Sequence, residues 1–190
     1  EQNKGLTHLN IGFNRIGDIG VRTLANGLAK VLPCMVLNKR GYPYYGIMQC
    51  EESRYHNENN AFVQGVYIEG HTDSDPIGKS GLPGDRNLTT NLKLSARRST
   101  NTFEALSAFQ PDILNFYGAV SDTDKLRFEP VLAASAYGEQ RPAADNGTRE
   151  GKKNNRRIDL RVVMYLPVNL EALRLLEKQL ETELVPKEDG

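Results

Sequence analysis

The chain has 190 residues, enough for one full-sized domain with an insertion or a tail. Its 24 Lys and Arg residues balance 24 Asp and Glu residues, so no net charge attracts it to nucleic acid or acidic lipid. No apolar run approaches the ~20 residues that span a bilayer, and no signal-peptide pattern is present, so we expect no membrane-spanning segment within these residues.

The first segment, LTHLNIGFNRIGDIG, has the spacing of a leucine-rich repeat over residues 6–20. One repeat cannot bury its own apolar face, and about three or more are needed for stability. No second copy occurs in the chain, so we interpret the segment as a short strand, Leu6–Phe13, followed by a helix from Asp18. Apolar residues recur on one face of this helix until Pro33 stops it.

Residues 34–62 form a predicted insertion, because they contain turn formers and polar residues without a sustained hydrophobic period. Cys34 and Cys50 lie within it and lack the spacing of a zinc site. They are either two unrelated thiols or a disulfide that closes a loop with 15 intervening residues. Such a bridge would stabilise the loop by about 3 kcal/mol in the chain-entropy model, and it requires an oxidising compartment.

Strand and helix patterns follow the insertion. Residues 64–70 predict a strand, and residues 71–87 predict a long loop rich in glycine, proline and aspartate. A helix is expected over 91–109, where apolar and small side chains lie close to one face. We then expect an irregular stretch with one helical turn at 112–117, and a strand at 131–138.

The last part of the chain predicts a short polar helix at 148–155, a strand at 156–166 and an amphipathic helix with a tail at 168–190. Helices on one face of a mixed sheet, with the other face in water, give a two-layer α/β sandwich. We assign residues 1–167 to this domain. The strand alternates between apolar residues on one face (Ile158, Leu160, Val162 and Met164) and charged residues on the other (Arg157, Asp159 and Arg161).

Asp73 and Arg98 are the candidate binding residues. Asp73 follows the strand that ends at Gly70, and Arg98 lies about two turns into the helix that starts at Asn91. In a strand–loop–helix unit, the loop and the first helical turns lie at the same end of the sheet. The pair can therefore bind a zwitterion, with Asp73 taking an ammonium group and Arg98 a carboxylate. In the alternative interpretation, Asp73 only caps the turn and Arg98 forms a surface ion pair of little energetic value.

Five short motifs occur in a fixed order along the chain. They are GHTD at 70–73, NLKLSARR at 91–98, YGEQRP at 137–142, NGTREG at 146–151 and NRR at 155–157. This order resembles the OmpA-like peptidoglycan-binding domain, whose βαβαββ sandwich agrees with the predicted elements. Within that family the chain is most similar to the MotB branch of flagellar stators and its relatives, which include the ZorB subunit of Zorya anti-phage systems.

The resemblance implies that Asp73 and Arg98 hold the diaminopimelate of the peptidoglycan peptide stem. It also implies that Thr72 and Asn91 line the same pocket and that Arg157 lies near its rim. The expected function is non-catalytic binding that anchors a membrane or motor complex to the cell wall, without a cofactor. The implied partners are peptidoglycan, a second copy of the chain and a MotA-like membrane protein reached through an upstream helix. The implied location is the periplasm, with the parent protein anchored in the inner membrane.

Other interpretations of these residues are weaker. The tail helix and the cysteine-flanked insertion suggest an alternative function, a dimerisation or assembly module of a stator-like complex with weak or gated wall binding. His71 and Asp73 provide no closed ligand set for a metal. Asp73 and Asp75 fit binding better than hydrolysis, since no nucleophile has an evident histidine partner. The basic run at 152–157 lacks interleaved aromatic residues, so we interpret it as solvated and expect no nucleic-acid partner.

Overall fold

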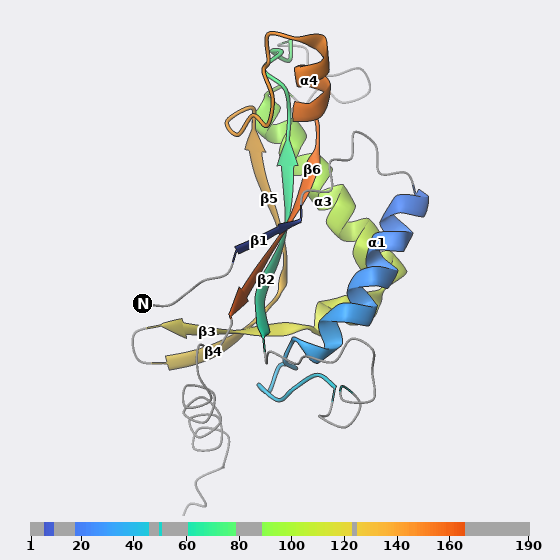
Figure 1. The fold of residues 1–190 in the computed structure, drawn as a ribbon, viewed down its shortest axis with the longest axis vertical. Coiled ribbons are helices and arrows are strands. Elements are labelled where there is room, and N and C mark those ends of the chain that lie inside the picture. Colours follow the sequence, from blue (N-terminus) through green and yellow to red (C-terminus); the bar gives the residue numbers. More distant parts are fainter. Residues whose placement is uncertain are drawn as a thin grey trace, which may run out of the picture.

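The structure is a computed structural model that describes residues 6–9, 18–45, 50, 61–78, 89–122 and 125–165. The main elements are β1 (Leu6–Leu9), α1 (Asp18–Val31), β2 (Phe62–His71), α3 (Asn91–Phe109), β5 (Leu132–Gly138), α4 (Arg149–Asn155) and β6 (Ile158–Tyr165). The strands form one sheet with the order β1-β6-β2-β5, and α1 and α3 lie on one side of it (Figure 1). No helix in the described part of the chain is long and apolar enough to cross a bilayer.

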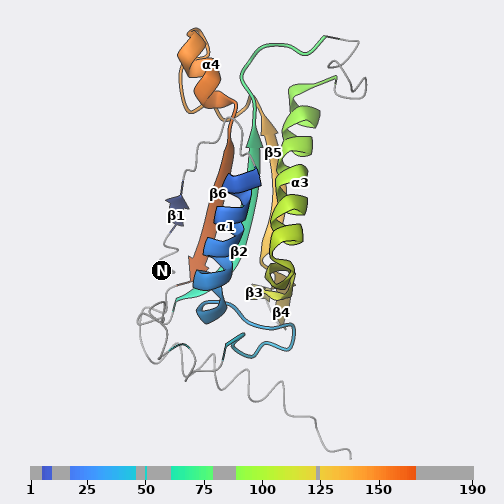
Figure 2. The same ribbon diagram turned by 90° about the vertical axis from the view of Figure 1, so that its right-hand side faces the viewer.

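The main sheet contains both parallel and antiparallel pairs. Strand β6 pairs antiparallel with β1 and β2, whereas β2 and β5 are parallel. A parallel pair needs a crossover connection, and α3 lies in the connection between β2 and β5. Figure 2 shows α1 in front of the sheet with α3 beside it, and the two helices contact each other. The predicted two-layer α/β sandwich with helices on one face is confirmed.

The hydrophobic core lies between the sheet and these two helices. Val66 and Ile68 of β2 and Leu106 of α3 are each 0% exposed. The register places Ile68 opposite Leu160, so the apolar residues of β6 enter the same core, as the alternation predicts. Helix α1 contributes Val21, Ala25 and Leu28.

The opposite face of the sheet differs from the prediction, because its charged side chains are largely buried. Arg157, Asp159 and Glu69 are only 8%, 4% and 2% exposed. Arg157 Nε donates to Asp159 Oδ2 at 2.9 Å, and Arg161 Nε donates to Glu69 Oε1 at 2.6 Å. The Tyr137 hydroxyl donates to the same Glu69 oxygen. Alternation along one strand shows which residues share a face, but the opposite charges that allow their burial come partly from neighbouring strands.

Helix α3 approaches β2 so closely that only glycine fits at the contact. A Cβ atom on Gly70 would lie 2.1 Å from the carbonyl oxygen of Ser95. The Ser95 side chain accepts a hydrogen bond from Gly138 N of β5 at 2.9 Å. One turn further along the helix, Arg98 Nη1 donates to the His71 carbonyl oxygen at 3.2 Å. These contacts fix α3 against the C-terminal end of β2.

A second, two-stranded sheet corrects the prediction for the stretch after α3. The chain forms the 3-10 helix η2 (Pro111–Asn115) and then a hairpin of β3 (Tyr117–Asp122) and β4 (Lys125–Pro130). The sequence predicts only the helical turn. It does not predict the hairpin, because residues 117–130 carry many charges and no clean apolar alternation.

The described part of the predicted insertion packs against this hairpin and the core. Val36 and Leu37 are 2% and 4% exposed. Leu37 and Tyr117 exchange two backbone hydrogen bonds, each 2.8 Å long. The Tyr44 ring meets the Phe116 ring edge-on, with centroids 4.7 Å apart. This segment is therefore held by apolar and backbone contacts.

Cys34, at the end of the 3-10 helix η1 (Leu32–Cys34), forms a disulfide with Cys50, and their Cα atoms are 5.6 Å apart. Of the two interpretations that the sequence leaves open, the bridge is confirmed. The remainder of the insertion at 46–49 and 51–60 lies outside the described residues, as does the predicted tail helix at 168–190. The domain boundary at 167 stays a prediction.

We predict that Gly70→Ala destabilises the domain, because the new methyl group would collide with the backbone of α3. The expected loss is about 1–3 kcal/mol, the range for overpacked core positions. Urea denaturation followed by circular dichroism measures it. Gly27→Ala in α1 is the matched control, since nothing lies within 4 Å of its Cβ position and alanine should stabilise the helix by up to about 1 kcal/mol. A Gly70→Ala variant as stable as the parent would contradict the close packing of α3.

We also predict that Cys34→Ser/Cys50→Ser lowers stability by about 3 kcal/mol, because the bridge restricts the unfolded chain. The fold should persist, since Val36 and Leu37 are buried independently of the bridge. Denaturation midpoints of parent and variant, with and without reductant, test this. Reductant should shift the midpoint of the parent alone, and a parent that does not respond would contradict the stabilising role.

Candidate functional site

The turn after β2 holds Asp73 in a defined position. Thr72 N donates to the Gly138 carbonyl oxygen at 2.8 Å, so the turn begins against β5. Asp73 Oδ1 accepts a hydrogen bond from Asp75 N at 3.1 Å. The Asn91 side-chain amide donates to the backbone carbonyls of Asp73 and Asp75 at 3.2 and 3.1 Å. Because Asn91 is the first residue of α3, the turn and the start of the helix are tied together.

Asp73 interacts with two guanidinium groups from different elements. The carboxylate is 7% exposed at the residue level, and its Oδ2 pairs with Nη1 of Arg156, the residue that follows α4. Burial lowers the pKa of the Arg98 guanidinium, Asp73 opposes that effect, and the charge of Arg156 adds to it. A guanidinium is not deprotonated in proteins, so Arg98 remains cationic. The structure thus brings the predicted pair Asp73 and Arg98 into one electrostatic cluster.

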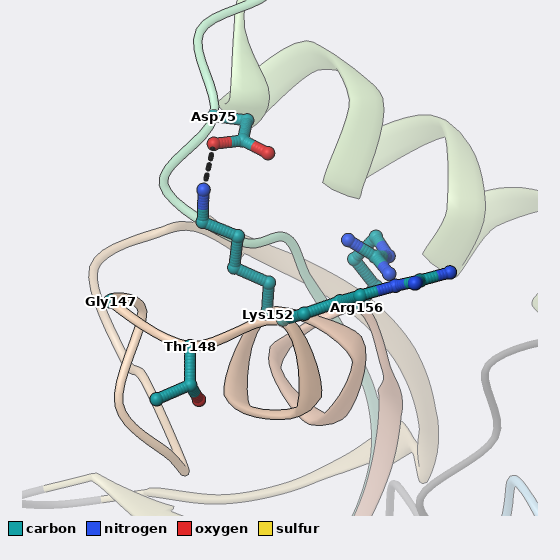
Figure 3. A pocket seen from close by; sticks show the side chains of 6 residues that line it. Asp75, Gly147, Thr148, Lys152 and Arg156 are labelled. Atoms are coloured by element: carbon teal, nitrogen blue, oxygen red, sulfur yellow. Dashed lines mark hydrogen bonds and ion pairs between the residues drawn. The ribbon is translucent and has the colours of Figure 1, made fainter.

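A cavity of about 380 Å³ lies between α4 and the turn after β2 (Figure 3). Lys152 Nζ reaches across from α4 to Asp75 Oδ1 at 2.6 Å. Arg156 both lines this cavity and pairs with Asp73, so the cavity adjoins the predicted binding residues. The lining residues are Asp75, Gly147, Thr148, Arg149, Lys152 and Arg156.

The wall of the cavity is fixed by Asn155, the last residue of α4. Asn155 is 0% exposed, and its Oδ1 accepts hydrogen bonds from Ala143 N and Ala144 N at 2.8 and 2.9 Å. Its amide also donates to Asn146 Oδ1 at 2.8 Å, and that oxygen accepts from Ser74 N at 3.3 Å. Asparagines from two of the sequence motifs therefore connect the loop before α4 to the turn that carries Asp73.

Arg157 and Thr72 lie deeper than the other predicted site residues. The Arg157 side chain is 9% exposed, pairs with Asp159 and donates from Nη2 to the Arg141 carbonyl oxygen at 3.2 Å. His71 Nε2 lies 3.3 Å from Asp159 Oδ2 in the same cluster. Thr72 is 3% exposed, and its Oγ1 is buried with no hydrogen-bond partner among the residues described. Neither residue lines the cavity, and their roles in ligand binding stay predictions.

Arg156 is the residue of this candidate site that the sequence interpretation missed, since it belongs to the basic run interpreted as solvated. Strand β6 starts two residues later and runs antiparallel to β2, with Ile158 opposite Gly70. The start of β6 therefore meets the end of β2, next to Asp73. The sequence contains both strand patterns, but the proximity of Arg156 to Asp73 follows only when β6 is paired antiparallel with β2.

The described residues contain no group of three or more His, Cys, Asp or Glu side chains arranged to hold a metal ion. The side chains that meet at the site are charged groups and an amide: Asp73, Asp75, Arg156, Lys152 and Asn91. A carboxylate flanked by guanidinium groups can bind a ligand that carries both an amine and a carboxylate.

No protein-family model matches the chain. In sequence, the chain is 33% identical to motility protein B of Bacillus subtilis over 102 residues, which cover 54% of this chain and 30% of the relative. It is 35% identical to outer membrane porin F of Pseudomonas aeruginosa over 95 residues, which cover 50% of this chain and 20% of that relative. The matches thus span less than a third of the length of these curated relatives.

Two solved structures are also similar. The periplasmic domain of Helicobacter pylori MotB has a TM-score of 0.45 at 17% identity, over 98% of this chain and 88% of that chain. The cell wall anchor of the T6SS from Pseudomonas aeruginosa has a TM-score of 0.44 at 18% identity, over 84% of this chain and 75% of that chain.

The sequence relatives confirm the resemblance that the motifs predict. They support an OmpA-like domain, the class that the ordered motifs resemble. Within that class, the similarity to motility protein B supports a domain of the MotB type.

The buried Asp159 carboxyl predicts how stability depends on pH. Burial raises the pKa of this carboxyl, but the close contact with His71 Nε2 and the charge of Arg157 outweigh it, so the folded-state pKa lies below the ordinary 3.8. A carboxyl with a depressed folded pKa stabilises the protein above its unfolded pKa of about 4, and this stabilisation is lost as the pH falls through the folded value.

We therefore expect Asp159→Asn to be less stable than the parent at neutral pH, with a difference that shrinks as the pH falls below about 4. Urea denaturation at a series of pH values measures the difference. Glu150→Gln is the control, because this carboxylate is 73% exposed and should change stability little at any pH. If the difference in stability between Asp159→Asn and the parent stays constant with pH, the lowered pKa of Asp159 in the folded state is refuted.

Proposed function

We propose that this domain binds the peptide stem of peptidoglycan, without catalysing a reaction, and so anchors a larger complex to the cell wall. The observation that carries the proposal is the position of Asp73 and Arg98. They come from the two motifs that the OmpA-like resemblance assigns to diaminopimelate, and they interact electrostatically at one end of the sheet.

The charges of these two residues match those of diaminopimelate. The amine at the free end of this amino acid is a cation, and Asp73 Oδ1 accepts only one backbone hydrogen bond among the described residues, which leaves lone pairs for an ammonium group. The neighbouring carboxylate of the ligand carries the opposite charge and suits Arg98, whose guanidinium has five N–H donors. Arg156 already pairs with Asp73, so an incoming ammonium group either shares this carboxylate with Arg156 or displaces it.

The proposal extends to the compartment and to the partners. Peptidoglycan lies outside the inner membrane, so the domain would work in the periplasm, where an oxidising environment supports the Cys34–Cys50 bridge. The resemblance to the MotB branch supports a homodimer whose parent is anchored in the inner membrane beside a MotA-like partner. A Zorya-type defence complex and an outer-membrane tether are the competing parents.

We predict that Asp73→Asn and Arg98→Gln lose binding to purified cell-wall sacculi. Removing one partner of a largely desolvated charge pair costs about 2–5 kcal/mol. The affinity for meso-diaminopimelate should therefore fall about 30-fold or more. Co-sedimentation with sacculi and calorimetric titration with meso-diaminopimelate measure both effects.

The control variants remove the same charges as Asp73→Asn and Arg98→Gln, but at exposed positions outside the site. Glu150→Gln removes one negative charge and Lys153→Gln one positive charge, from side chains that are 73% and 58% exposed on α4. Circular dichroism checks that each variant is folded. If the folded Asp73→Asn and Arg98→Gln variants bind like the parent, the site assignment is wrong.

A further inference from the structure

We propose that the cavity between α4 and the turn after β2 is a second subsite of the same binding site. It takes the free C-terminal carboxylate of the peptide stem, one or two residues beyond the diaminopimelate. This inference rests on the proposed function. It adds a preference for stems that end in a free carboxylate.

The cavity has an excess of positive charge. Its lining contains Arg149, Lys152 and Arg156 against the single carboxylate of Asp75. Lys152 is paired with Asp75, and Arg156 with Asp73. The Arg149 side chain is exposed and makes no hydrogen bond or ion pair with any residue that the structure describes. One guanidinium therefore remains available to an anion at this position.

The position of the cavity suits a peptide that is already held at Asp73. Arg156 lines the cavity and contacts Asp73, so the two subsites share a wall. An extended peptide advances by about 3.3–3.6 Å per residue, so one or two further residues reach an adjoining pocket. The volume of about 380 Å³ lies within the range of small-ligand pockets and is sufficient for such a terminus.

Hydrogen bonds and close packing within the chain hold the backbone around the cavity in place. Thr148 Oγ1 accepts a hydrogen bond from Gly151 N at 2.9 Å. A Cβ atom on Gly151 would lie 1.8 Å from the Asp145 carbonyl oxygen, so the loop packs tightly on α4. The buried Asn155 side chain holds the same loop by accepting hydrogen bonds from Ala143 N and Ala144 N. A pre-formed wall lets its cations bind an anion without a further ordering cost.

A carboxylate fits this lining better than a polyanion. Asp75 lies in the cavity wall and would repel a highly charged ligand such as a phosphate chain. Guanidinium groups instead bind a single carboxylate with two parallel hydrogen bonds. The chemistry thus points to a peptide terminus.

The test compares two tetrapeptide stems that contain meso-diaminopimelate, one with a free C-terminal carboxylate and one with an amidated C-terminus. Calorimetric titration should show that the parent binds the free acid about 5- to 10-fold more tightly than the amide, as expected for one partly exposed charge-assisted contact. Arg149→Gln and Arg149→Gln/Lys152→Gln should reduce this ratio toward 1. Lys153→Gln, a neighbouring exposed lysine that does not line the cavity, should retain it.

The outcomes separate the subsite from the proposed function. If the parent binds both peptides equally, or the two variants keep the full ratio, the subsite is refuted while binding at Asp73 stands. If inorganic phosphate competes with the free acid as well as acetate does, selection of a carboxylate is refuted. If the parent binds neither peptide nor meso-diaminopimelate, the proposed function fails as well.

Discussion

The close approach of α3 to β2 is the constraint on which the site depends. Gly70 carries no side chain, so the backbone of α3 at Ser95 can lie against the strand. The Ser95 side chain then accepts a hydrogen bond from β5, which ties the helix to two parallel strands. Arg98 follows Ser95 by one turn, so its guanidinium reaches the end of β2. A larger residue at Gly70 would move both the helix and this charge.

The antiparallel pairing of β2 with β6 supplies the second half of the site. It brings the residues that precede β6 to the turn after β2, and Arg156 therefore meets Asp73. The same pairing places Asp159 opposite Glu69 on the face away from the helices. Each of these carboxylates has an arginine partner on β6 or directly before it, so both are buried as ion pairs.

The loop before α4 is organised by side-chain amides. Asn155 satisfies two backbone N–H groups and also donates to Asn146, which in turn accepts from the turn after β2. This network needs little apolar burial, and it holds α4 where Lys152 can reach Asp75. The domain thus combines a hydrophobic sandwich with a polar end that carries the charged side chains.

Local sequence determined much of the fold and the central pair of the candidate site. The helix 91–109 was predicted at the same bounds as α3, and the strand at 64–70 lies within β2, because each has a clear hydrophobic period. Strand–loop–helix geometry predicts that Asp73 and Arg98 lie together, because a strand, a loop and the following helix place their ends at one side of a sheet, whereas Asn91 is implied only by the resemblance. These contacts form within one contiguous segment.

Tertiary structure alone decided the features that depend on distant segments. Arg156 appeared solvated in the sequence, and its pairing with Asp73 exists only because β6 lies beside β2. The hairpin of β3 and β4 has no clean alternation of its own, and it forms where Leu37 of the insertion pairs with Tyr117. The bridge between Cys34 and Cys50 was one of two interpretations until the chain brought the two residues together. A one-dimensional pattern records which residues share a face of one element, whereas burial and charge pairing depend on which other element covers that face.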